Sequence, residues 1–74
     1  MPARRPEGAM ADRYRIGLAT LNYLPRIVYY LHVRDNFTFP EIAFRLGTSV
    51  WEVEEYFAAA LAHLDRAVHR EGEG

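Results

Sequence analysis

The stretch that decides the fold covers residues 38–64 and reads TFPEIAFRLGTSVWEVEEYFAAALAHL. Two helix-start signals lie within it. Thr38 is followed three residues later by Glu41, and Ser49 is followed three residues later by Glu52. In such a capping box the hydroxyl accepts a hydrogen bond from an early backbone N–H, while the carboxylate reaches back to the cap residue. The stretch therefore predicts two consecutive helices with defined starts.

Gly47 lies between the two signals, where a left-handed residue ends the first helix at little cost. The turn at residues 47–49 is short, so the helices must cross at a steep angle. We expect helices over residues 39–46 and 50–70, the pattern of a helix-turn-helix. The apolar positions that recur at helical spacing and should face the core are Ile42, Ala43 and Leu46, then Val53, Phe57, Ala60, Leu61, Leu64 and Val68.

Two further helices are expected before this unit. Asp12 can cap a helix that runs to about Leu21, although Gly17 weakens it. Asn22 can cap a second helix that ends at the turn residues 35–36. Their core positions are predicted at Tyr14, Leu18 and Leu21, and at Leu24, Ile27, Val28 and Leu31. The chain is thus predicted to be all-α, with four helices over residues 12–70, a flexible arm at 1–11 and a frayed tail at 71–74.

Length and composition predict one small domain. Half of the 74 residues are hydrophobic, which favours folding, and the absence of cysteine excludes disulfides and thiolate metal sites. The longest apolar region is interrupted by polar residues, and the first residues lack the apolar core of a signal peptide, so we expect a cytoplasmic protein. His32, His63 and His69 lack the spacing of a ligand set. Without a phosphate loop or nucleophile elbow, neither an enzyme nor a cofactor is expected.

The charge balance bears on nucleic-acid binding. The nine basic residues, all arginine, face ten acidic ones, for a formal net charge of -1. A DNA-binding domain is usually basic, because neutralising phosphates and releasing counterions provides most of its non-specific affinity. Aromatic residues make up 14% of the chain, which indicates a face that can bind another protein.

The order of these elements resembles region 4 of the sigma-70 family of bacterial RNA polymerase subunits, most closely the extracytoplasmic-function type. That family has an apolar helix, a short loop, Ser/Thr-x-x-Glu-Ile-Ala-x-x-Leu-Gly, then Ser-Val-x-x-Val and a long helix. The resemblance covers residues 12–68, and its matching positions are core, cap or turn residues, so it concerns the fold more than the function. These positions are Thr38, Glu41, Ile42, Ala43, Leu46, Gly47, Ser49, Val50 and Val53.

The resemblance implies a role in transcription regulation, because region 4 recognises the promoter's -35 element and docks on RNA polymerase and anti-sigma proteins. Carried over position by position, the DNA-facing candidates are Arg45, Thr48, Trp51, Glu52, Glu55, Tyr56 and Ala59. The family is rich in small, hydroxyl and basic residues there, whereas Glu52, Glu54 and Glu55 should repel phosphate. Their alternative role is to cap the helix and complement its dipole, the interpretation we favour. If DNA is bound, we expect help from a partner chain, from dimerisation, or from Arg4, Arg5 and Arg13.

A second hypothesis is a protein-interaction module that has lost DNA binding. It would bind RNA polymerase, an anti-sigma protein or a second copy through an aromatic patch of Trp51, Tyr56, Phe37 and Phe39, since tyrosine and tryptophan are enriched in interface hot spots. The alternative for these rings is that they fold back and complete a thin core. A third hypothesis is a stable evolutionary remnant with no partner.

Overall fold

The computed structural model describes residues 6–69, and side chains from residue 10 onward. No strand occurs in that part of the chain, which confirms the predicted all-α class. The elements in order are α1 (Pro6–Thr20), α2 (Tyr23–Tyr29), the π-helical turn η1 (Tyr30–Arg34), α3 (Phe39–Leu46) and α4 (Val50–His69). None of these helices is both long enough and apolar enough to cross a lipid bilayer.

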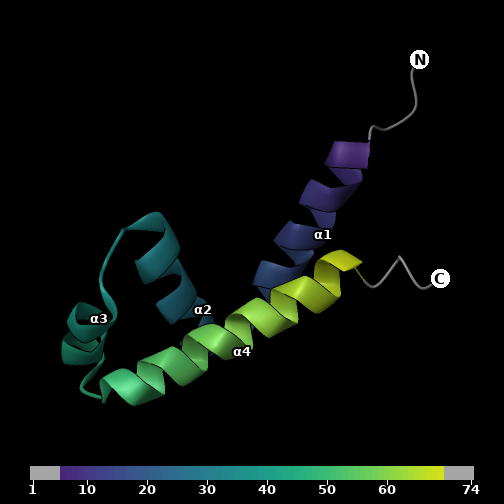
Figure 1. Cartoon of the computed structure of the whole chain (residues 1–74). Helices are drawn as coiled ribbons and strands as arrows, with labels where there is room; N and C mark the ends of the chain where they lie inside the picture. Colours follow the sequence, from purple (N-terminus) through teal and green to yellow (C-terminus); the bar gives the residue numbers. More distant parts are fainter. Residues whose placement is uncertain (1–5, 70–74) are drawn as a thin grey trace.

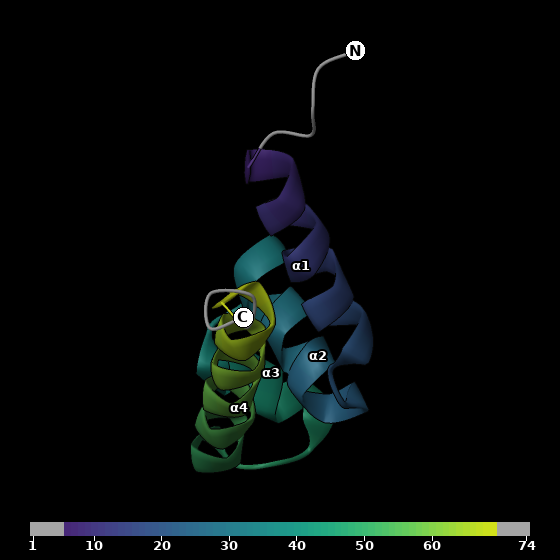
Figure 2. The same cartoon turned by 90° about the vertical axis from the view of Figure 1, so that its right-hand side faces the viewer.

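The long helix α4 is the support on which the other helices pack. Figure 1 shows α3 beside its first turns, α2 beside its middle and α1 beside its C-terminal part. Seen from the side, α1, α2 and α3 all lie to one side of α4 (Figure 2). The molecule is accordingly elongated, with extents of 50 × 23 × 15 Å. This arrangement leaves the opposite side of α4 uncovered.

Both predicted capping boxes are present. The Thr38 hydroxyl accepts a hydrogen bond from Glu41 N at 3.2 Å, and Thr38 N donates to Glu41 Oε1 at 2.8 Å. At the second box Glu52 N donates to Ser49 Oγ at 3.1 Å and Ser49 N donates to Glu52 Oε1 at 3.3 Å. Gly47 ends α3 in the left-handed conformation, with φ of 69°. The starts of α3 and α4 and the turn between them thus follow the local signals.

The boundaries before this unit differ from the prediction. The first helix begins at Pro6, so the predicted start at Asp12 is wrong, and residues 6–11 are helical where a flexible arm was expected. A proline is compatible with the first helical turn, and Asp12 instead pairs with Arg15 at 2.6 Å. Residues 1–5, with Arg4 and Arg5, lie outside the described part of the chain, as does the predicted tail at 71–74.

The second predicted helix changes its winding before it ends. After Tyr29 the chain forms the π-helical turn η1, in which Asp35 N donates to Tyr30 O at 3.2 Å. Asn36 then adopts a left-handed φ of 63°, which confirms the predicted turn. Phe37 N donates back to Leu31 O at 2.9 Å and holds the following loop against the helix end.

The core consists of two clusters. The first cluster, between α1, α2 and α4, contains Leu21, Tyr29, Ala60 and Leu64, with Leu18, Tyr30 and Phe57 packed against it. The second cluster, beneath α3 and the start of α4, contains Val28, Ile42, Ala43 and Val53, with Leu31, Phe37, Phe39, Leu46, Tyr56 and Phe57 packed against it. Phe57 contacts both clusters and joins them.

Three predicted core positions are wrong, because Tyr14, Leu24 and Leu61 are 39%, 37% and 48% exposed. These residues lie beside the helix–helix interfaces. Because the other helices cover only one side of α4, no further helix buries the side chains at the edges of these interfaces. Tyr14 still contacts the core through its hydroxyl, which lies 2.7 Å from the hydroxyl of Tyr29.

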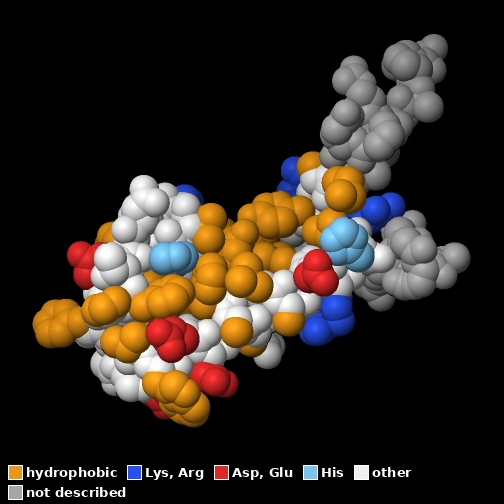
Figure 3. All heavy atoms as spheres, viewed as in Figure 1, with side chains coloured by type: hydrophobic (Ala, Val, Ile, Leu, Met, Phe, Trp, Pro, Cys, Tyr) orange, Lys and Arg blue, Asp and Glu red, His pale blue; other side chains and the backbone are white. Residues whose placement is uncertain are grey.

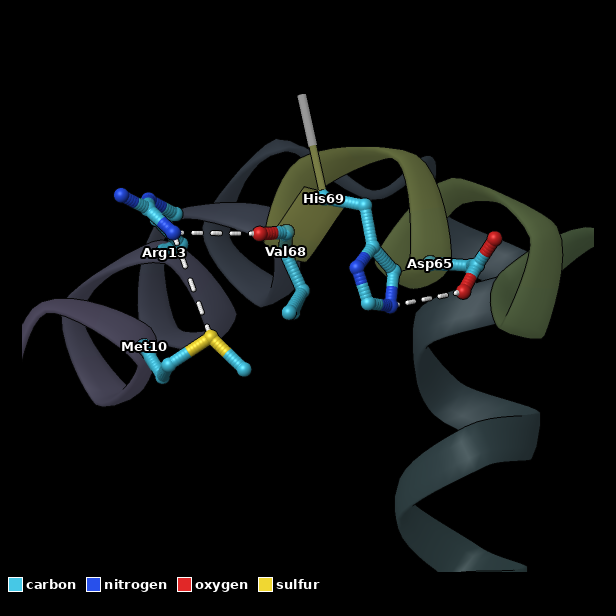
Figure 4. Close-up of polar contacts among 5 residues, drawn as sticks. All are labelled: Met10, Arg13, Asp65, Val68 and His69. Atoms are coloured by element: carbon cyan, nitrogen blue, oxygen red, sulfur yellow. Dashed lines mark hydrogen bonds and ion pairs between the residues drawn. The ribbon is translucent and has the colours of Figure 1, made fainter. Parts of the chain in front are cut away.

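The end of α4 is tied to α1 by polar and close-packed contacts (Figure 4). Arg13 Nη1 donates to Val68 O at 3.4 Å and contacts Met10 Sδ at 3.9 Å. A cation at the C-terminal turn of a helix satisfies a carbonyl that has no partner within the helix. His69 lies 3.4 Å from Asp65 on the same helix (Figure 4). Arg13 therefore has a structural position at the end of the molecule opposite the helix-turn-helix.

Candidate interaction surface on α3 and α4

Two large aromatic side chains are exposed on either side of the turn that joins α3 and α4. Phe44 of α3 is 87% exposed and Trp51 of α4 is 66% exposed. Phe44 points outward because Ile42 and Ala43 occupy the buried side of α3, and each residue advances about 100° around a helix. Trp51 points outward because Val53 and Phe57 face the core. Both rings therefore lie in solvent, and Figure 1 shows that the elements that carry them, α3 and the start of α4, lie at the same end of the molecule.

A shallow groove runs beside Phe44. It is lined by Phe37, Pro40, Glu41, Phe44 and Arg45. The Arg45 guanidinium lies over the Phe37 ring, 4.5 Å from its centroid, a cation–π arrangement. Hydrogen bonding to Thr38, chiefly to its backbone N–H, lowers the pKa of Glu41, so this carboxylate is ionised at neutral pH. The groove thus combines apolar walls with one negative and one positive charge.

The start of α4 is acidic, and its three glutamates have different roles. The carboxylate of Glu52 accepts hydrogen bonds from the Thr48 hydroxyl and from Ser49 N, so it caps the helix. Glu54 and Glu55 are exposed. In the sequence no arginine or lysine occurs between Arg45 and Arg66. The surface around Trp51 therefore carries negative charge that no neighbouring base on α4 offsets.

The predicted DNA-facing residues divide into two groups. Helical spacing places Trp51, Glu52, Glu55 and Ala59 on one exposed side of α4. The other three are engaged in the fold: Arg45 stacks on Phe37, Thr48 donates to Glu52, and Tyr56 is half-buried against the second cluster. Arg13, proposed as an auxiliary DNA contact, packs against the far end of α4 instead.

The predicted aromatic patch is not continuous. Of its four members only Trp51 is exposed, because Phe37, Phe39 and Tyr56 pack on the second cluster. His32 explains why the loop folds back: its Nδ1 lies 2.9 Å from Phe37 O, and its ring lies 4.5 Å from the Phe39 ring. The two loop phenylalanines therefore complete the core, the alternative considered for them.

Phe44 is the functional candidate that the sequence reasoning missed. Its signal was available, because a phenylalanine two residues after Ile42 and two before Leu46 falls on the outer side of an amphipathic helix. A large apolar side chain at a position that would suit a charged residue costs solubility without adding to the core. Phe44 is therefore a candidate for a contact with another molecule.

The described residues offer no metal site: no group of three or more histidine, aspartate or glutamate side chains converges in them.

A second groove lies between α1 and α4, lined by Ile16, Thr20, His63, Asp65, Arg66, Ala67 and His69. Within it, the Thr20 hydroxyl and His63 Nε2 lie 2.8 Å apart, which ties the two helices together.

Comparison of the chain with protein-family models gave no match, and neither did comparison with curated proteins or with solved structures.

Proposed function

We propose that this chain acts in transcription regulation as a helix-turn-helix domain that docks on another protein through α3 and the start of α4. The observation that carries the proposal is the exposure of Phe44 and Trp51, at 87% and 66%, on either side of the turn. Exposed aromatic rings with a polar surround mark protein interaction sites, and tryptophan is enriched in their hot spots. The sigma region 4 resemblance supports the regulatory role and suggests RNA polymerase or an anti-sigma-type protein as partner.

Binding of promoter DNA is the second candidate. It is favoured by the position of Trp51, Glu52, Glu55 and Ala59, on the exposed side at the start of the second helix, the part that enters the major groove in helix-turn-helix proteins. A glutamate can accept from cytosine N4. Against it stands the negative charge of this face, since phosphate contacts provide most of the affinity of such domains. The electrostatics favour the protein partner.

The fluorescence of Trp51, the single tryptophan, separates the two candidates. We would titrate the purified protein with mixed-sequence duplex DNA at low and moderate salt and follow Trp51 emission, with light scattering on the same samples. The proposal predicts no saturable change at either salt concentration. A saturable change that weakens as salt rises would show that the start of α4 meets DNA and would overturn the proposal.

A matched variant makes a negative result informative. In Glu54→Gln/Glu55→Gln the two exposed charges are removed while the Glu52 cap remains. If the face were a weakened DNA reader, this variant would gain a salt-sensitive fluorescence change with duplex DNA. We expect neither protein to respond.

The regulatory role is measured by in vitro transcription with purified bacterial RNA polymerase holoenzyme. Added wild-type protein is expected to change the transcript yield, and Phe44→Ser/Trp51→Ala is expected to lose that effect. Ile16→Ser is the control, because Ile16 is 59% exposed on α1, at the other end of the molecule. An effect that persists in Phe44→Ser/Trp51→Ala would contradict the assignment of this surface.

A further inference from the structure

We infer that the partner of this surface presents an amphipathic helix with an apolar stripe and a basic rim. The inference rests on the proposed docking function and specifies the chemistry of the partner. The surface, called here the aromatic surface, consists of Phe44, Trp51 and the groove beside Phe44.

The secondary structure at this end of the molecule favours a helical partner over an extended peptide. Residues 38–69 contain no strand, so no sheet edge is available to which an extended peptide could add by main-chain hydrogen bonds. Protruding apolar side chains beside a groove instead suit the packing of a helix, whose residues at i, i+3 and i+4 form a hole for each ring. Beyond Trp51 the outer side of α4 carries Ala58, Ala59 and Ala62, all exposed, and small side chains let a second helix approach closely.

The charge of the aromatic surface indicates which residues should border the apolar stripe of the partner helix. Residues 37–59 contain one arginine and four glutamates, a formal charge of −3, whereas residues 10–36 contain four arginines and two aspartates, a formal charge of +2. The stretch that forms α3 and the start of α4 is therefore acidic, whereas the stretch before it is basic. On the face seen in Figure 3, hydrophobic side chains protrude with acidic ones between them at the end formed by α3 and the start of α4, and basic side chains lie mainly near α1 and the C-terminal part of α4.

The same charge argues against two other occupants. A second copy that docked through its own aromatic surface would bring four further glutamates against these, and like charges facing each other across an interface are unfavourable. A nucleic acid would meet the same repulsion. A lysine- or arginine-rimmed helix gains attraction on approach and places its apolar stripe over Phe44 and Trp51.

Two designed peptides of about 18 residues, five helical turns, test the inference. Both carry the same leucine stripe; the rim is lysine in one and glutamate in the other. Each is titrated into the protein while Trp51 emission is followed, and the circular dichroism of the mixture reports helix formation by the peptide. We expect the lysine-rimmed peptide to shift Trp51 emission to the blue in a saturable way and the glutamate-rimmed peptide to leave it unchanged.

Variants show whether the peptide binds at the aromatic surface. Phe44→Ser should weaken binding by about tenfold or more, as loss of a hot-spot ring does. Because Phe44 is 87% exposed, this change should leave the fold intact, which thermal unfolding would check. Glu54→Gln/Glu55→Gln should weaken binding at low salt more than at high salt. Ile16→Ser, remote from the surface, should bind like the wild type.

The outcomes separate this inference from the proposed function. Failure of the lysine-rimmed peptide to bind, or binding that does not depend on Phe44, would overturn the inference. If both peptides bound equally well and Phe44→Ser weakened both, the inference that the partner has a basic rim would be wrong. The proposal that another protein docks at this surface would still stand. A saturable response of Trp51 to duplex DNA would overturn the proposed function itself.

Discussion

Gly17 of α1 lies where the approach of α4 leaves no room for a side chain. A Cβ added there would lie 2.8 Å from Ala67 Cβ and 3.0 Å from Leu64 Cδ2. Alanine would favour the helix by about 1 kcal/mol relative to glycine, but overpacking typically costs about 1–3 kcal/mol. The Ala67 Cβ has no rotamer by which to move away, so the helices would have to separate.

We therefore expect Gly17→Ala to lower the free energy of unfolding by about 1 kcal/mol, as measured by urea denaturation. The control is Gly17→Ala/Ala67→Gly, in which the removed methyl group makes room for the added one and part of the loss should return. A more stable Gly17→Ala protein would mean that helix propensity outweighs the contact.

The contact between the hydroxyls of Tyr14 and Tyr29 makes the stability of the fold depend on pH. Burial, and then the hydrogen bond in which the Tyr29 hydroxyl donates to Tyr14, raise the pKa of Tyr29 from 10.0 to about 12. A folded-state pKa above the unfolded value means that neutral Tyr29 stabilises the fold below pH 10, and that this contribution is lost as the pH rises from 10 through about 12. The protein should therefore lose stability in that alkaline window.

Ultraviolet difference titration of the tyrosines should show one late ionisation near pH 12. Tyr14→Phe should shift it to lower pH, because the Tyr29 hydroxyl loses the acceptor that stabilises its protonated form. Tyr23→Phe is the matched control, since Tyr23 is 68% exposed and belongs to neither core cluster. An unchanged late ionisation in Tyr14→Phe would contradict the role of the hydrogen bond.

At the scale of elements, α3 and α4 each begin with a capping box. Thr38 and Ser49 each accept a hydrogen bond from a backbone N–H that has no other partner within its helix. Replacing either with alanine should cost about 1 kcal/mol of folding free energy, measured by denaturant unfolding. The conservative changes Thr38→Ser and Ser49→Thr keep the acceptor and should cost much less. Equal losses in the conservative and alanine variants would assign the effect to packing instead.

At the scale of the whole molecule, the core is divided into two clusters, because the other helices pack one after another along α4. The radius of gyration is 14.6 Å, compared with about 11 Å for a compact chain of this length. Within the described residues α1 packs chiefly on α4, while α3 packs on α4 and η1. The two clusters are joined through Phe57. Such an arrangement favours local opening of α1 without loss of the helix-turn-helix.

Amide hydrogen exchange measures this division. Leu64→Ala, in the first cluster, should lower protection in α1 more than in α3, whereas Ile42→Ala, in the second cluster, should do the reverse. Each truncation of a buried aliphatic side chain should cost about 2–5 kcal/mol. Uniform loss of protection across all helices in both variants would show a single cooperative unit.

The sequence by itself determined the features that depend on neighbouring residues: the all-α class, both caps, the left-handed turn at Gly47, and the outward position of Trp51 with its glutamates. These follow from helical periodicity and from side chains that bond their own backbone within a few residues. The roles in DNA or protein binding stay predictions, because they depend on a second molecule.

Only the tertiary structure decided the features that depend on contacts between distant residues. Gly17 reads as a weak point in a helix until Ala67 is placed beside it. The sequence leaves open whether Phe37 and Phe39 lie on the surface or in the core. His32 and the second cluster hold the loop inward, which leaves Phe44 as the exposed phenylalanine. Periodicity shows which side of a helix is apolar, but burial depends on which flanks a neighbouring helix covers, and that is set by packing across the whole chain.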